Sequence, residues 1–476
     1  MLGLFGTLNM GSRSLSTQRT GIELAGHNMA NANNPAYSRQ RVSVETAGAF
    51  ATTQGIQGTG ADVGAIKRIR NELLDDQIAR EGSVSGSLLA QQQALKYAQA
   101  NLGQQIDRLA TGAEGSAAAN GTGTQHGIAE ALADMFNSFQ SLSTQPTSEV
   151  ERKIVLDKGA SLANRFNQTD QRLSALRSSL DSNLEVDAKS ANTIMSEVAR
   201  LNDRISTAEL LSEGTANDLR DARTAKLEEL AALVKFEVSE GDGGAVNISI
   251  DGTIMVSGSQ TLDQIETYDA GGGQMMLRAK NSTSPLNVMG GSLHGIITAR
   301  DGEIAELQTD LRALAGLLIT EVNAIHANGY GLDGSSGNPF FTGNDASDIQ
   351  VNRTLVDDPR LLQASGEAGV TGDNSVIVGM AQLQTKQQAG LDGQTFSQRY
   401  TQIVASLGES ISEVNFQVVD QGVVEKMLKG QRDSISGVSL DEEMTDLIKY
   451  QKAFEASARL ITTVDEMLDT VVNLIR

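Results

Sequence analysis

Apolar residues recur at intervals of seven near both ends of this 476-residue chain. Near the N-terminus the repeat consists of Leu8, Leu15, Ile22 and Met29, and near the C-terminus of Leu440, Leu447, Phe454, Ile461, Leu468 and Ile475. Heptad repeats of this length predict helices that pack lengthwise against other helices. At 1.5 Å per residue the C-terminal helix would be about 50 Å long, too long for one small domain to cover. We therefore expect these residues to form subunit interfaces.

The N-terminal heptads run into an asparagine cluster within AGHNMANANNPAYSRQ, residues 25–40. The cluster consists of Asn28, Asn31, Asn33 and Asn34. Asparagine amides can bond the free carbonyls at a helix end and tolerate a left-handed backbone. Pro35 disfavours a helical conformation at Asn34 and blocks continuation of the helix. We interpret Asn31, Asn33 and Asn34 as a helix cap and turn, with Asn28 still on the helix, and keep contact of Tyr37 or Arg39 with a neighbouring subunit as a further hypothesis.

The middle of the chain combines further helices with one clear hairpin. Apolar residues at spacings of three and four predict helices over 128–212, with a break near Pro146, and over 304–325. Alternating apolar residues around Asp251-Gly252 predict a β-hairpin. Gly58-Thr59-Gly60 fits a turn between strands better than a dinucleotide loop. The expected fold is mainly α with a smaller β-rich part.

We expect three structural parts, each assembled from separate segments of the chain. The inner terminal-helix domain comprises residues 1–50 and 436–476. The helical-bundle middle domain comprises residues 51–235, 291–345 and 396–435. The outer β-rich module comprises residues 236–290 and 346–395.

Composition and spacing argue against enzymatic or metal chemistry. Cysteine is absent, which excludes disulfides and thiolate chemistry. The four histidines, His27, His126, His294 and His326, lack zinc-site spacing. The glycine-rich segment 329–348 lacks the ligand spacing of a calcium-binding EF-hand loop. We therefore predict no catalytic, cofactor-binding or metal-binding residues. A secreted glycan hydrolase remains the alternative from another class, although 59 acidic residues produce carboxylate pairs by chance.

The charge and hydropathy patterns restrict partners and location. The formal net charge of −21 disfavours binding to nucleic acid or to an anionic membrane surface. No apolar run approaches the roughly 20 residues of a membrane-spanning helix. The N-terminal segment has no basic residue before Arg13, so a cleaved signal peptide is not expected.

Motifs at both ends and in the middle resemble bacterial flagellar axial proteins, the family of rod, hook and hook-associated proteins. The segments are LAGHNMANANNPAYSRQ, GTGADVGAIKRIRNELLDDQIARE, ANDLRDARTAKLEELAALV and YQKAFEASARLITTVDEMLDTVVNLI. YSRQ at residues 37–40 and SGVSLDEEM at residues 436–444 point to the hook-associated branch. The family motif residues of the N-terminal segment are Asn28, Asn31, Asn34, Pro35, Tyr37, Ser38 and Arg39. Asn34 and Ala36 stand where the family usually has threonine and glycine, which puts a glycine-dependent turn there in question.

The resemblance implies a fold and a set of partners. The two terminal helices would form an antiparallel coiled coil inside a tubular homo-oligomer that joins hook to filament. The implied partners are other copies of the chain, the hook protein, the next junction protein, and an export chaperone on the C-terminal region. Location outside the cell, on the flagellum, would follow type III export without a cleaved signal. A hook or rod subunit is the alternative within the same class.

Overall fold

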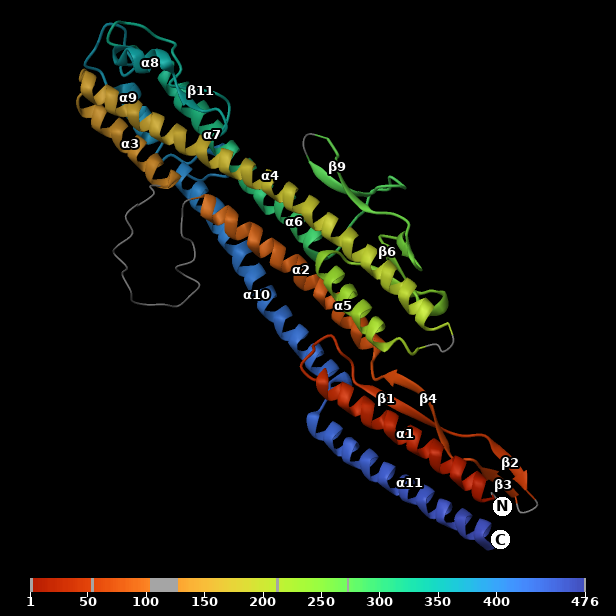
Figure 1. Cartoon of the computed structure of the whole chain (residues 1–476). Coiled ribbons are helices and arrows are strands. Elements are labelled where there is room, and N and C mark those ends of the chain that lie inside the picture. Colours follow the sequence, from red (N-terminus) through yellow and green to blue (C-terminus); the bar gives the residue numbers. More distant parts are fainter. Residues whose placement is uncertain (1–2, 53–54, 103–126, 211–213, 272–273, 475–476) are drawn as a thin grey trace. The chain divides into compact units, whose positions relative to one another are not determined.

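The computed structural model describes residues 3–52, 55–102, 127–210, 214–271 and 274–474. The predicted interface residue Ile475 and His126 lie outside these ranges. The chain forms two compact units, coloured along the sequence in Figure 1. Unit 1 comprises Met1–Gly86, Asp187–Gly291 and Asp420–Arg476, and unit 2 comprises Ser87–Val186 and Ser292–Val419. The three-part division expected from the sequence stays a prediction.

Most of the chain is helical, as the sequence predicts. The helices are α1 (Leu4–Ala30), α2 (Glu72–Asn101), α3 (Ile128–Thr144), α4 (Glu149–Ala208), α5 (Asn217–Leu233), α6 (Gly291–Asp301), α7 (Glu303–His326), α8 (Arg353–Asp357), α9 (Ser375–Gln382), α10 (Phe396–Ser436) and α11 (Leu440–Leu474). The end of α3 and the start of α4 confirm the predicted break near Pro146. The boundaries of the two units fall within α2, α4 and α10.

The strands form small antiparallel sheets. They are β1 (Gln40–Thr46), β2 (Ala49–Thr52), β3 (Gly55–Gly58), β4 (Ala61–Arg68), β5 (Glu237–Glu240), β6 (Val246–Ile250), β7 (Thr253–Ser257), β8 (Gln260–Thr261), β9 (Ile265–Asp269), β10 (Met275–Ala279), β11 (Phe341–Thr342) and β12 (Gln350–Val351). The largest described sheet has the order β5-β6-β7-β8. The end of β3 and the start of β4 confirm the predicted turn at Gly58–Gly60.

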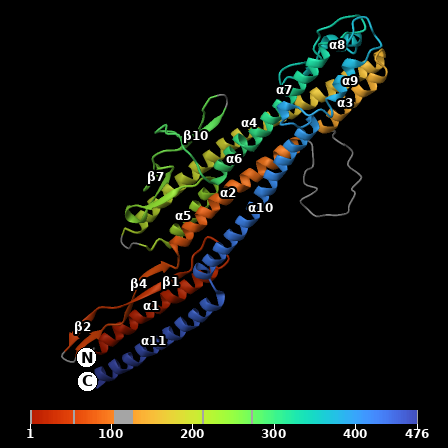
Figure 2. The same ribbon diagram turned by 180° about the vertical axis from the view of Figure 1, so that it is seen from behind.

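In unit 1, α1 and α11 lie side by side and antiparallel in both views (Figures 1 and 2). Near the N-terminal half of α1, the Ser14 hydroxyl lies 2.8 Å from that of Ser457. Near the end of α1, the Asn28 amide donates to Glu443 over 3.0 Å. Residue numbers therefore rise along one helix as they fall along the other. The structure confirms the antiparallel terminal pair that the family resemblance implies.

Small residues on α1 make the close approach to α11 possible. Gly11 and Gly21 are buried, and a Cβ added at Gly21 would lie 2.7 Å from the Tyr450 ring. The predicted heptad residues of α1 flank this seam and are half-buried: Leu8, Leu15, Ile22 and Met29. On α11, Leu447, Ile461 and Leu468 are half-buried, whereas Leu440 and Phe454 are 54% and 37% exposed. The role of these ten residues in contacts with other subunits stays a prediction.

A neighbouring side of α1 packs on the β1–β4 ribbon, which pairs in antiparallel register from Gln40–Arg68 to Thr46–Ala61. The Thr17 hydroxyl donates to the Ala61 carbonyl over 3.0 Å. Arg13 forms an ion pair with Asp62 at 2.7 Å. The first helix therefore packs on both α11 and a two-stranded ribbon, and its remaining side is exposed.

The predicted hairpin at 246–256 is confirmed. Asp251 and Gly252 both have positive φ angles, 49° and 74°, as a two-residue turn of type I′ requires. Asn202 on α4 bonds both backbone groups of Val246, accepting from its amide at 3.2 Å and donating to its carbonyl at 2.8 Å. One asparagine side chain thus attaches the first strand of the hairpin to α4.

The core of unit 2 is built from α3, α7, α9 and the first part of α4. Its buried aromatic side chains include Phe136, Phe139 and Phe340. His326, at the end of α7, is fully buried beside the Phe340 ring. Its Nδ1–H donates to the Asn338 carbonyl at 2.8 Å, and its Nε2 accepts from the backbone N–H of Gln363 at 3.0 Å. These two bonds require the neutral imidazole with its proton on Nδ1.

We predict that acid destabilises unit 2 through His326. Burial lowers the pKa of His326 to about 4. Between pH 6.5, the pKa of histidine in the unfolded chain, and about pH 4, the unfolded chain binds the proton and the folded chain does not. The contribution of His326 to the stability of unit 2 is therefore complete above pH 6.5 and falls below it. The loss should be about 1.4 kcal/mol per pH unit and about 3 kcal/mol in total. Imidazole resonances followed by NMR, and urea unfolding at pH 7.0 and 5.5, would measure both effects.

The matched variant for this test is His326→Gln, whose amide can donate to Asn338 and accept from Gln363. Burial also lowers the pKa of His294, so the variant keeps that contribution and loses only that of His326. A His326 resonance that titrates at its ordinary value near 6.5 would contradict the prediction.

We predict that Gly21→Ala weakens the α1–α11 pair. Three Tyr450 ring atoms lie 2.7–2.9 Å from the position of the new Cβ, so the helices must separate or the ring must move. The expected cost is about 1–3 kcal/mol. Gly26→Ala is the control in the same helix, because a Cβ there meets nothing within 4 Å and should stabilise the helix slightly. Amide exchange of α11 would distinguish the two variants, and equal protection in both would disprove a tight seam.

Candidate functional site

Asn28 is the centre of a hydrogen-bond network between the two chain ends. Its side-chain amide accepts from the Gln40 N–H at 3.1 Å and donates to the Gln40 carbonyl at 3.0 Å. It also donates to Glu443 Oε2 at 3.0 Å and accepts from the Tyr37 hydroxyl at 2.7 Å. Asn28 is helical and buried, so its amide joins α1, β1 and α11 instead of capping the helix.

Arg39 binds the first turn of α11 through three carboxylates. Its Nε contacts Glu443 at 2.6 Å, its Nη1 contacts Glu442 at 2.5 Å, and its Nη2 lies 3.6 Å from Asp446. Glu442 therefore faces Arg39, because a guanidinium attracts a carboxylate strongly.

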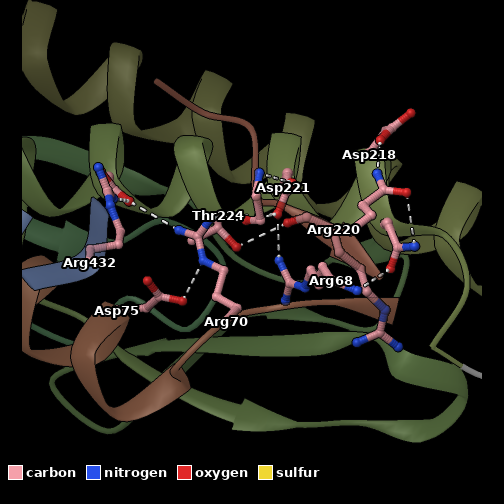
Figure 3. Close-up of polar contacts among 12 residues, drawn as sticks. Arg68, Arg70, Asp75, Asp218, Arg220, Asp221, Thr224 and Arg432 are labelled. Atoms are coloured by element: carbon pink, nitrogen blue, oxygen red, sulfur yellow. Dashed lines mark hydrogen bonds and ion pairs between the residues drawn. The ribbon is translucent and has the colours of Figure 1, made fainter. Parts of the chain in front are cut away.

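Asp221 on α5 binds Ser38, the motif residue that precedes Arg39. Figure 3 shows Asp221 together with Arg68 and Arg70. The Asp221 carboxylate accepts from the Ser38 amide and the Ser38 hydroxyl, each at 2.7 Å, and from Arg68 at 2.9 Å. Arg70 lies 3.5 Å from the same carboxylate and 2.7 Å from Asp75. Two arginines therefore share one buried aspartate, and this arrangement holds β1, the end of β4 and α5 together.

A second ion pair extends this cluster to α10. Arg432 contacts Glu228 on α5 at 2.5 Å, and Arg70 lies 3.6 Å from the same carboxylate. We call the whole set the terminal joint, defined by Asn28, Tyr37, Ser38, Arg39, Gln40, Arg68, Arg70, Asp221, Glu228, Arg432 and Glu443. All of these residues belong to unit 1.

Tyr37 contributes to the terminal joint as a neutral donor. Burial, together with the carboxylates of Asp218, Asp221 and Glu443, raises the pKa of Tyr37. The hydroxyl therefore keeps its proton and donates to Asn28. Its oxygen also lies 2.9 Å from Nδ1 of His27.

The turn after α1 is formed without any left-handed residue. The Asn31 side chain donates at 3.0 Å to the His27 carbonyl, which also accepts the Asn31 backbone N–H at 3.2 Å, so this amide adds a second bond to a helix carbonyl that is already bonded. The Asn34 side chain accepts from the Ala36 N–H at 3.1 Å. The non-glycine residues with positive φ in the described chain lie elsewhere. Alanine at position 36 is therefore compatible with the turn, and the left-handed conformation considered for the asparagines is not adopted.

A cleft of about 630 Å³ borders the outer side of the terminal joint. Asn33, Asn34 and Pro35 form one exposed wall, and the end of α10 with the α10–α11 connection, residues 434–439, forms the other. Ser436 lines this cleft and is buried, and its hydroxyl has no hydrogen-bond partner in the described structure. The motif thus has an inner half that bonds within the chain and an outer half that borders an open cleft.

In the described residues, no three histidine or carboxylate side chains gather closely enough to hold a metal ion. In the glycine-rich segment, Asp348 Oδ1 accepts from the amides of Asn344 and Asp345 at 2.7 and 3.0 Å. That carboxylate stabilises a turn. None of the helices in the described part is long and apolar enough to cross a membrane.

The structure brings most of the predicted motif together and adds partners that the sequence pattern had not singled out. Asn28, Tyr37, Ser38 and Arg39 meet in the terminal joint, whereas Asn31, Asn34 and Pro35 form the adjoining turn. Asp221, Arg70 and Glu443 were missed as partners. All three lie inside sequence motifs that were quoted without roles for these residues. That the side chains of these three charged residues are buried can be seen only from the tertiary packing.

Comparison with known proteins gives independent support. Residues 118–341 match the family described as the helical domain of flagellar hook-associated protein FlgK, and residues 430–474 match the C-terminal part of flagellar basal body rod proteins FlgEFG. Flagellar hook-associated protein 1 of Bacillus subtilis is 27% identical, with 99% of both chains covered. The Escherichia coli protein of the same name is 23% identical, with 98% of this chain and 99% of that protein covered.

The fold also has a solved counterpart. The flagellar hook junction protein FlgK of Burkholderia pseudomallei aligns with a TM-score of 0.64 and 14% identity. The alignment covers 76% of this chain and all of that one.

Paired terminal helices, joined through this motif and followed by a helical body, define an axial protein of the bacterial flagellum. The matches to flagellar hook-associated protein 1 extend over nearly the whole chain and identify the family more specifically. The chain belongs to the family of flagellar hook-associated protein 1.

We predict that Asp221→Asn strongly destabilises unit 1. The change removes the charge that Arg68 and Arg70 share, and leaves both guanidiniums without it in a buried setting. Breaking a buried pair in this way costs about 3–5 kcal/mol. Asp218→Asn is the control on the same helix, since the exposed Asp218 accepts one bond, from Gln40. Urea unfolding of the two variants would test the assignment, and equal losses would refute a special role for Asp221.

Proposed function

We propose that this chain joins the hook to the filament of the bacterial flagellum as a structural subunit of a tubular assembly. Membership of the hook-associated family supports the junction role. The observation that supports assembly through the terminal helices is the apolar surface left on α11 after it has packed on α1. Large apolar side chains there are more than half exposed: Leu440, Met444, Ile448, Met467 and Val472.

Other copies of the chain are the proposed cover for this surface. Helix α1 covers only part of the circumference of α11. The heptad residues and their neighbours therefore leave apolar surface exposed to water. Burial of apolar area is favourable by about 25 cal/mol per Å². A helix with apolar residues on more than one flank is suited to contact several neighbours at once. The interface residues that we propose are those of the two heptad repeats.

The terminal joint suits an assembly subunit because it holds α1, α11 and α5 in one arrangement. The outer wall of the cleft at Asn33, Asn34 and Pro35 is the proposed place for a contact with an adjacent subunit. Arg39 and Tyr37 take part in that contact indirectly, since both already bond within the chain. Their role is to position the turn that would make it.

Export and chaperone capture extend the proposal. The exposed apolar residues of α11 would need protection before assembly, and a dedicated chaperone on the C-terminal region would supply it. Passage through the flagellar channel without a cleaved signal would place the protein outside the cell. Hook protein and the next junction protein are the proposed neighbours along the flagellar axis.

The test is complementation of a strain that lacks the protein. Deletion should leave hooks without filaments, and the unaltered chain should restore them. Phe454→Asp should fail, with less than about a tenth of normal filament number, because a carboxylate placed in the heptad track resists burial. Gln451→Asp is the control, because Gln451 is polar, is exposed and does not belong to the heptad repeat. Electron microscopy of the cells would count hooks and filaments.

The outcomes separate the alternatives. Missing hooks in the deletion strain would indicate a hook or rod subunit. Complete, stable filaments in that strain would refute the junction role. Full rescue by Phe454→Asp would refute the heptad interface but would leave the junction role intact. Turnover of glycan by the purified chain, lost on changing one carboxylate, would favour the hydrolase.

A further inference from the structure

A second groove in unit 1 lies away from the terminal helices. It has a volume of about 550 Å³ and is lined by α2, α5 and the first two strands of the β5–β8 sheet. Its apolar walls are formed by Leu73, Leu227, Phe236 and Val238. Leu73 is 68% exposed and Val238 41% exposed, so neither is covered by the chain. The volume is within the range of pockets that bind ligands or peptide side chains.

Arg223, which lines this groove, is a buried cation without a carboxylate partner. The residue is 5% exposed, and its Nη1 donates to Asn202 Oδ1 at 2.9 Å and to the Gly244 carbonyl at 2.7 Å. In the part of the chain that the structure describes, no carboxylate lies within ion-pair distance of it. Desolvation and the charges of Arg220 and Arg68 lower the pKa of Arg223 to about 10. A buried guanidinium surrounded by other arginines favours an anion in the adjoining space.

The carboxylates of Glu209 and Glu72 offset part of this preference, and most of the other charges at the groove are already paired. Arg220 is paired with Glu209 at 2.7 Å, and Arg80 is paired with Asp76 at 2.6 Å. Asp75 and Glu228 are held by the arginines of the terminal joint. The rim groups without a described ion pair are Glu72, Glu240 and Lys235, so the rim is slightly acidic, and only the immediate surroundings of Arg223 suit a single negative charge on a ligand.

The edge of the sheet at this groove is free. β5 is the first strand in the order β5-β6-β7-β8, so it pairs with β6 on one side and with no described strand on the other. All four of its residues, Glu237–Glu240, are exposed. Phe236, Val238 and Glu240 alternate along the chain and all line the groove. A strand added beside β5 would therefore direct every second side chain into the same groove.

We propose that this groove binds an extended peptide segment of a partner protein, which adds to the free edge of β5. The segment places one apolar side chain between Leu73, Leu227 and Val238, and a carboxylate two residues away on Arg223. Backbone bonds to β5 supply a sequence-independent contribution, and the paired pockets select an apolar residue followed at the second position by an acidic one. This proposal is independent of the junction role.

The experiment uses the full chain and a capped pentapeptide in which leucine and glutamate alternate with threonine. Calorimetry should give a measurable affinity, and replacing the peptide glutamate by glutamine should weaken binding about tenfold, as for a charged hydrogen bond. In Arg223→Gln, whose amide can still donate to Gly244, the two peptides should bind with the same affinity. Val238→Lys should weaken both peptides equally without touching Arg223.

The location is tested by amide exchange. Binding should slow exchange of the outward-facing amides of β5, and a peptide N-methylated along its pairing edge should lose binding. Equal affinity of the glutamate and glutamine peptides for the unaltered chain would overturn the proposal, whether or not Arg223→Gln folds. So would octanoate binding as tightly as the peptide, because that would assign the groove to a small amphiphilic anion. Absence of binding by the glutamate peptide would also overturn it.

Discussion

The carboxylate of Glu443 is the group on which the arrangement of the chain ends depends. It is buried, and a buried carboxylate is tolerated only where cations or hydrogen-bond donors compensate for lost water. Arg39 and Asn28 provide that compensation from the other end of the chain. Because both donors sit on the segment that leaves α1, the start of α11 is held at the end of α1. The antiparallel pairing of the two helices then follows along their length.

Two kinds of contact hold the parts of unit 1 together. The seam between α1 and α11 uses small residues, Gly11 and Gly21, so the backbones approach closely and large apolar residues remain at the flanks. The terminal joint uses charge, with Asp221 and Glu228 shared among three arginines. Guanidinium groups suit this sharing because each presents several donors in a fixed plane. The result is a firmly held pair of helices that still has apolar surface for neighbours, as a subunit of a tubular assembly needs.

Sequence periodicity predicted the elements better than the contacts. The heptads, the break near Pro146 and the Asp251-Gly252 turn depend on neighbours within a few residues, and all correspond to observed elements. In the asparagine cluster, Asn28 was expected on the helix and the later members at its end, yet the side chains have three different roles. Asn28 joins three elements, Asn31 bonds a helix carbonyl, and Asn34 closes a turn. Identical side chains differ here because their distances to Gln40 and Glu443 differ, and local sequence does not contain those distances.

By itself, the sequence determined that the two ends are amphipathic helices, that a small hairpin interrupts a helical body, and that the motifs are those of a flagellar axial protein. Those properties depend on side-chain period, turn chemistry and motif identity. Only the tertiary structure decided which face of α1 meets α11, which carboxylates hold Arg39 and Arg70, and that Arg223 is buried without an acidic partner. The reason is physical: pairing of charges depends on which residues exclude water together, and residues more than 400 positions apart do so here.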